Sequence, residues 1–147
     1  MVWMHELNTQ QRKALRQILK DPPPADEMVR SFLDAFYHFE ALLRKVENYY
    51  RCRPGAKTSG TDHRSLDIAV ARRSLKHFNI KISESTLTLL LSSELKKRNS
   101  RSARNLRNAI AHNWSQADRK EVIDRHQQLM EALNTAINWF NLTIQQR

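Results

Sequence analysis

Residues 26–50, DEMVRSFLDAFYHFEALLRKVENYY, give the strongest indication of the fold class. Its apolar residues recur at the spacing that places side chains on one face of an α-helix, and this stripe continues for about six turns. The stripe consists of Val29, Phe32, Leu33, Phe36, Leu43, Val46 and Tyr50. One long apolar stripe must be covered by other elements, so the stretch predicts the central member of a helical bundle.

The residues that interrupt regular structure are few and clustered. Pro22 to Pro24 form one break, and Pro54, Gly55 and Gly60 form a second. Long uninterrupted segments between breaks favour helices. Asp26, just after the prolines, is a candidate N-cap. We expect an all-α, single-domain, up-and-down bundle of four to five helices covering residues 1–147.

The other expected helices follow from the same periodicity. They cover about 9–20, about 66–78, a fourth segment capped by Ser83 or Ser85 and carrying leucines up to Leu95, and a final helix from about Gln116. Residues 53–64 are expected to form a loop. The pattern leaves open whether the fourth helix continues through Asn99 and Ser100 to His112.

Composition restricts the class of protein. The chain has no stretch of about 18 apolar residues, and its first residues lack the layout of a signal peptide. A single cysteine, Cys52, excludes an intramolecular disulfide framework and a multi-cysteine zinc site. These features predict a cytoplasmic protein. The formal charge of +10 favours a polyanionic partner such as nucleic acid; a solvated basic surface and an acidic protein partner are the alternatives.

The basic charge is concentrated before His112. Residues 96–107, KKRNSRSARNLR, contain six basic residues and no acidic one. On a continuous helix, Lys97, Arg101, Arg104 and Asn108 would form one face, which suits a track for phosphates. An exposed face that serves solubility is the other interpretation. The predicted nucleic-acid-binding residues are Lys96, Lys97, Arg98, Arg101, Arg104 and Trp114.

The basic run ends in Leu106-Arg107-Asn108-Ala109-Ile110-Ala111-His112. This stretch resembles the signature of the HEPN superfamily (higher eukaryotes and prokaryotes nucleotide-binding), in which an Arg, followed by a polar residue, precedes a His by four to six positions. The signature usually ends a helix that comes before the last long helix of a small bundle. Two other pairs, Arg72 with His77 and Arg119 with His126, match the bare spacing, but each Arg is followed by a bulky basic residue.

The resemblance implies a metal-independent endoribonuclease, a toxin or defence effector, with no cofactor. RNA carries its own nucleophile, the 2′-hydroxyl, so cleavage needs proton transfer and stabilisation of charge on the phosphate. A histidine such as His112 can transfer the proton, and an arginine such as Arg107 can bind the phosphate oxygens. Asn108 can orient either residue or bind the ribose. The predicted catalytic residues are therefore Arg107, Asn108 and His112.

The spacing of the motif bears on the assembly. Positions five apart on an ideal helix differ by about 140° in direction, so Arg107 and His112 converge poorly within one chain. Each motif also supplies one proton-transfer residue, whereas in-line cleavage benefits from a base and an acid. The HEPN resemblance implies a homodimer in which two Arg–His pairs face one cleft.

The chain departs from the HEPN toxins at one position. Those paired with minimal nucleotidyltransferases commonly have a Tyr two residues after the His, where the antitoxin can attach AMP, but this chain has Trp114. Trp114 has no hydroxyl, so neutralisation by that route is not expected, although a cognate antitoxin or regulatory protein is a candidate partner. Trp114 is a candidate for stacking on a base or packing at the interface.

The sequence also allows two further interpretations. The first is a non-catalytic RNA- or protein-binding module of HEPN-like shape, which retains Arg107 and His112 for contact alone. The second concerns Glu40 and Glu47 on the long central helix. They could support an active site, but we expect them to lie on a solvated face.

Overall fold

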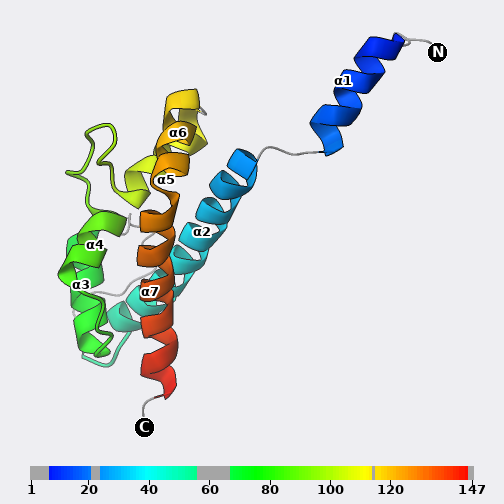
Figure 1. The fold of residues 1–147 in the computed structure, drawn as a ribbon. Coiled ribbons are helices and arrows are strands. Elements are labelled where there is room, and N and C mark those ends of the chain that lie inside the picture. Colours follow the sequence, from blue (N-terminus) through cyan, green and yellow to red (C-terminus); the bar gives the residue numbers. More distant parts are fainter. Residues whose placement is uncertain (1–6, 21–23, 56–66, 114, 146–147) are drawn as a thin grey trace.

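The computed structural model describes residues 7–20, 24–55, 67–113 and 115–145 (Figure 1). These residues form helices and no strand, which confirms the predicted all-α class. The seven helices are α1 (Thr9–Lys20), α2 (Pro24–Arg51), α3 (Ile68–His77), α4 (Glu84–Leu91), α5 (Ala103–Asn113), α6 (Gln116–Asp124) and α7 (His126–Gln145).

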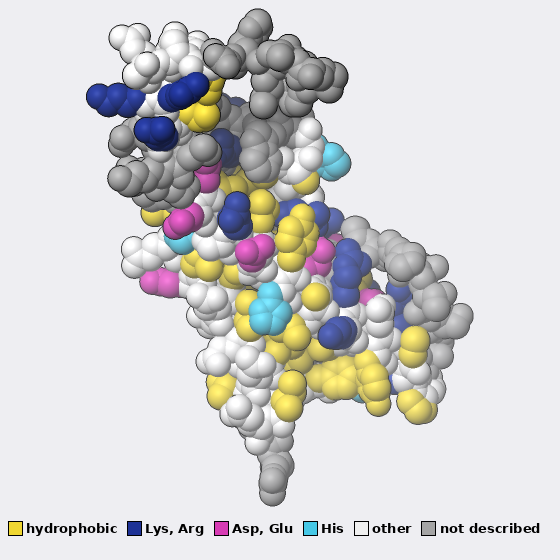
Figure 2. Space-filling view, turned by 90° about the vertical axis from the view of Figure 1, so that its right-hand side faces the viewer, with side chains coloured by type: hydrophobic (Ala, Val, Ile, Leu, Met, Phe, Trp, Pro, Cys, Tyr) yellow, Lys and Arg dark blue, Asp and Glu magenta, His cyan; other side chains and the backbone are white. Residues whose placement is uncertain are grey.

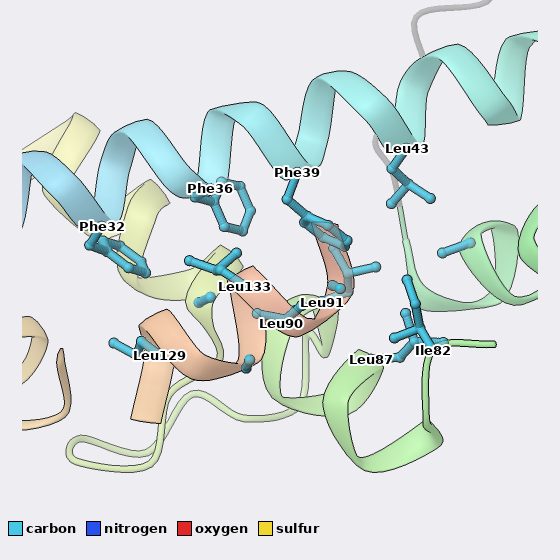
Figure 3. Packing of buried hydrophobic residues seen from close by; sticks show 14 of the residues in the cluster. Phe32, Phe36, Phe39, Leu43, Ile82, Leu87, Leu90, Leu91, Leu129 and Leu133 are labelled. Carbon is cyan, nitrogen blue, oxygen red and sulfur yellow. The ribbon is translucent and has the colours of Figure 1, made fainter. Parts of the chain in front are cut away.

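The long helix α2 is the centre of the fold. It packs against α7 over much of its length and also contacts α3, α5 and α6. Figure 3 shows Phe32, Phe36, Phe39 and Leu43 of α2 pointing into an interior shared with leucines of α4 and α7. All four side chains are at most 1% exposed. Complete burial of each such side chain stabilises the fold by about 1.5–3 kcal/mol, so this stripe holds the bundle together.

Side-chain caps fix where the shorter helices begin. The Asp67 side chain accepts a hydrogen bond from the Val70 backbone N–H at the start of α3, and Ser83 accepts one from Thr86 at the start of α4. Of the two serines predicted as caps, Ser83 is therefore the one used. Asn79, between α3 and α4, has a φ of 58°, a left-handed conformation that ends the helical path.

The structure answers the question left open for the fourth helix. The helix ends at Leu91, and residues 92–102 form an irregular segment before α5 begins. Within this segment Asn99 has a φ of 70°, which a right-handed helix does not allow. The prediction of one helical face carrying Lys97, Arg101, Arg104 and Asn108 is therefore wrong, because the first two residues precede α5.

The final helix is also divided, so the described chain has more helices than the four to five predicted. α6 ends at Asp124 and α7 begins at His126, with Arg125 as the C-cap between them. The Arg125 guanidinium donates a hydrogen bond to the Arg101 carbonyl oxygen at 2.8 Å. This contact ties the break between α6 and α7 to the irregular segment, a long-range constraint that helical periodicity does not reveal.

Helix α1 lies away from the other helices in Figure 1, at the top right of the view. The described side chains of residues 7–16 are all exposed. The boundaries of α1 agree with the predicted helix at 9–20. The prediction of one domain over residues 1–147 stays a prediction. Among the described residues, no helix is both long enough and apolar enough to cross a membrane.

Candidate functional site

The HEPN-like motif lies on α5, whose two faces differ. Ala103, Leu106 and Ile110 are at most 1% exposed and anchor the helix in the core. The start of α5 is fixed by Ser102, whose hydroxyl accepts a hydrogen bond from the Asn105 backbone N–H at 3.1 Å. The anchored face turns the polar residues of the motif away from the core.

Arg107 is held in place by residues of α2. Its Nη2 donates a hydrogen bond to Glu40 Oε2 at 2.7 Å, and both side chains are about one-fifth exposed, at 22% and 20%. The guanidinium carbon lies 5.3 Å from the centre of the Phe36 ring and 5.7 Å from that of Tyr37. An ion pair and two aromatic rings therefore orient the predicted phosphate-binding group before any substrate is present.

A pocket opens between α2 and α5 around Arg107. Its volume is about 140 Å³. The lining residues are Phe36, Glu40, Leu43, Arg44, Leu91, Arg104, Arg107 and Asn108. Two of the three predicted catalytic residues, Arg107 and Asn108, thus share one pocket with the predicted nucleic-acid-binding residue Arg104.

His112 is placed differently. It is exposed, and it is not among the residues that line the pocket. This placement agrees with the difference of about 140° expected between Arg107 and a residue five positions later on the same helix. Within one chain, the described structure brings Arg107 together with Asn108 but does not bring His112 into their pocket.

The basic run before α5 is divided by its contacts. Lys96, Lys97 and Arg98 are exposed in the irregular segment. Arg101 instead bonds Asp118 at 2.7 Å and Glu121 at 2.8 Å, and its side chain is 12% exposed. Its charge is thus matched by two carboxylates within the protein.

Glu121 is the centre of this ion cluster. Its carboxylate also accepts hydrogen bonds from the backbone N–H groups of Asn99 and Arg101 and from the Arg125 guanidinium. Burial alone would raise the pKa of Glu121, but the hydrogen bonds from Asn99, Arg101 and Arg125 outweigh burial and lower it. Burial likewise opposes ionisation of Asp118, but Ser115 and Arg101 lower its pKa. The cluster fixes the irregular segment against α6.

On the face of the molecule drawn in Figure 2, Lys and Arg side chains are interspersed with acidic and hydrophobic ones. The remaining predicted nucleic-acid-binding residue, Trp114, lies outside the described residues. No group of three or more His, Cys, Asp or Glu side chains suited to a metal ion occurs in the part of the chain that the structure describes.

Glu40 and Arg44 line the pocket but were not among the predicted site residues. Glu40 was expected on a solvated face, and that expectation is wrong because the residue borders the pocket and binds Arg107. The same expectation is wrong for Glu47, which is 7% exposed and pairs with Arg51. A signal existed: Glu40 follows Phe36 by four residues, so it sits beside the apolar stripe rather than opposite to it.

Comparisons with known proteins identify no relative: no family model, curated protein or solved structure matches this chain.

Proposed function

We propose that this chain is a metal-independent endoribonuclease of the HEPN type, acting as a toxin or defence effector through a composite active site in a homodimer. One observation carries the proposal most strongly. Arg107 of the RNxxxH motif is oriented by Glu40 and lines a pocket with Asn108, and a histidine follows on the exposed end of the same helix. The pocket and the motif are therefore consistent with a phosphate-binding group and one proton-transfer group for RNA cleavage by its own 2′-hydroxyl.

In the proposed reaction, a His112 imidazole removes the proton of the 2′-hydroxyl, and the oxygen attacks the adjacent phosphorus. Arg107 donates hydrogen bonds to the phosphate oxygens as negative charge develops on them. The 5′-oxygen of the next nucleotide leaves and takes a proton from a second acid. The products are a 2′,3′-cyclic phosphate and a 5′-hydroxyl, so the bonds and protons balance without an added reactant.

The homodimer supplies the second acid in this proposal. Each chain has one His in the motif, and His112 lies outside the pocket of its own Arg107. A second subunit facing α5 would bring another His112 to the same cleft. The Tyr37 ring, close to Arg107 and 50% exposed, offers apolar surface for such an interface. Light scattering at tens of micromolar should therefore give the mass of a dimer, and an active monomer would contradict the composite site.

The direct test of the reaction uses single-stranded RNA in excess EDTA. We expect cleavage that leaves a 2′,3′-cyclic phosphate or 3′-phosphate and a 5′-hydroxyl. A DNA oligonucleotide of the same sequence should bind but stay intact, because it lacks the 2′-hydroxyl. Loss of RNA cleavage in EDTA, with recovery on adding Mg²⁺, would contradict the proposed mechanism.

One observation favours a second candidate function, a non-catalytic RNA- or protein-binding module. Arg107 is already paired with Glu40, and His112 does not share their pocket. In such a module Arg107 would stabilise the contact between α2 and α5, and the basic residues would serve for binding alone. Salt-dependent RNA binding without cleavage of any RNA substrate would favour this function over the nuclease.

A further inference from the structure

The pocket between α2 and α5 has a size that suits a small oxyanion. Its volume is about 140 Å³. An engineered protein cavity of about 150 Å³ accommodates benzene, and a tetrahedral phosphate group has no more heavy atoms than benzene. Unlike that engineered cavity, this one has charged walls, so an apolar ligand is not the natural occupant.

The charge on the pocket walls is positive. Among the lining residues, Arg44, Arg104 and Arg107 each carry a positive charge and Glu40 carries a negative charge. Glu40 is shared, because its Oε2 binds Arg107 at 2.7 Å and its Oε1 lies 3.9 Å from Arg44 Nε. The formal excess of two positive charges matches a phosphate that carries one or two negative charges.

Not all hydrogen-bond donors of the residues that line the pocket are used. The Nε atom of Arg107 is buried and has no hydrogen-bond partner among the described residues. The Arg104 side chain forms no ion pair with another residue in the described ranges. Asn108 adds an amide that can donate to an oxyanion. A buried, unsatisfied donor is costly, and an anion that accepts from it would remove that cost.

We propose that this pocket is a phosphate subsite, in which Arg44 of α2 and Arg104, Arg107 and Asn108 of α5 hold a phosphate group of RNA. The identification of the ligand as RNA rests on the proposed ribonuclease function. Glu40 is the internal counter-ion of the subsite: it orients Arg107 when the pocket is empty and repels the phosphate that enters. The occupant is the phosphate at which cleavage takes place, because Arg107 donates to that phosphate in the proposed reaction. His112 of the same chain does not line the pocket, so His112 of the partner subunit would act there.

If Glu40 has this role, its replacement should change the affinity for phosphate, which replacing a purely structural residue would not do. Glu40→Gln keeps a hydrogen-bond acceptor for Arg107 but removes the negative charge beside the ligand. Phosphate should therefore bind more tightly to this variant, by about tenfold. Arg104→Gln and Arg44→Gln should each weaken phosphate binding by about tenfold or more, because each removes a charge-assisted hydrogen bond.

The experiment is a titration of the ¹⁵N-labelled full chain with inorganic phosphate at constant ionic strength, followed by NMR. The Asn108 side-chain amide should shift saturably in the wild type. The matched controls are Arg72→Gln and Glu84→Gln, which alter an exposed ion pair that does not line the pocket and should leave phosphate binding unchanged. Amide dispersion reports whether each variant folds, and Arg44, 43% exposed, replaces Arg104 if the latter variant does not.

A second arm identifies the source of the phosphate. Inorganic phosphate should compete with a 2′-O-methyl RNA oligonucleotide, which binds but cannot be cleaved, and Glu40→Gln should bind that oligonucleotide more tightly. Absence of saturation, weaker phosphate binding by Glu40→Gln, or phosphate binding without competition would each overturn the proposal. If phosphate does not bind in this way but RNA is still cleaved, the subsite is wrong and the ribonuclease function is retained. If phosphate and RNA bind but RNA is not cleaved, the ribonuclease function is wrong and the subsite is retained.

Discussion

Arg101 and Arg107 belong to one run of basic residues but lie in different surroundings. Arg101 is 12% exposed and faces two buried carboxylates, those of Asp118 and Glu121. Arg107 is 22% exposed, faces the single carboxylate of Glu40, and borders a pocket. Two arginines of one basic run thus differ in how far their charge is already matched by carboxylates of the protein. Arg101 stabilises the fold, whereas we expect Arg107 to act on a substrate.

The largest effect should come from the motif. His112→Ala is expected to lower the rate of RNA cleavage by about 10²–10⁴-fold, because it removes the group that transfers the proton. The thermal midpoint should stay near that of the wild type, since the side chain is exposed. His77→Ala, at the other Arg–His pair of the same spacing, is the control and should cleave normally. Equal activity in both variants would remove His112 from the mechanism.

Substitutions in the ion cluster around Arg101 should instead lower the free energy of unfolding. Glu121→Gln removes the buried carboxylate that Arg101 and Arg125 share and leaves Arg101 with Asp118 alone. Breaking a buried pair costs about 3–5 kcal/mol. Urea denaturation should show this loss in the free energy of unfolding. Glu131→Gln, at an exposed glutamate on α7, should change it by less than about 0.5 kcal/mol. A loss of that small size for Glu121→Gln would contradict the structural role of the cluster.

The same cluster predicts how stability depends on pH. The pKa values of Glu121 and Asp118 are lowered in the folded protein, so the folded state holds these protons less tightly than the unfolded state does. Their contribution is therefore complete above the unfolded carboxyl pKa of about 4 and is lost as the pH falls below it. Thermal melts between pH 7 and pH 3 should show this decline, and Glu121→Gln should make it shallower.

The smallest expected effect is on the salt dependence of RNA binding. Replacing Lys97 and Arg104 with Gln should reduce the log–log slope of RNA binding against salt by about 0.7 for each phosphate that the variant no longer neutralises. Arg101→Gln should leave the slope of the folded protein unchanged, because its guanidinium already serves Asp118 and Glu121. An unchanged slope for the double variant would place the RNA footprint elsewhere on the surface.

The parts of the structure that follow local rules could be predicted from the sequence. The apolar stripe of α2, the boundaries of α1 and the cap at Ser83 depend on residues within a few positions of one another. The irregular segment 92–102 could not be predicted, because Glu121 binds Asn99 from 22 positions away. The same holds for the candidate site: Arg107 and His112 follow from the motif, but Glu40 meets Arg107 across 67 positions.

The most direct test of the central claim compares Arg107→Ala with Arg101→Ala in one assay, the rate of RNA cleavage in excess EDTA per folded molecule. Arg107→Ala should stay folded and lose about 10²–10³-fold in rate, as expected for loss of a group that stabilises transition-state charge. Arg101→Ala should be less stable, yet its folded molecules should cleave at close to the wild-type rate. Undiminished cleavage by folded Arg107→Ala would contradict the account.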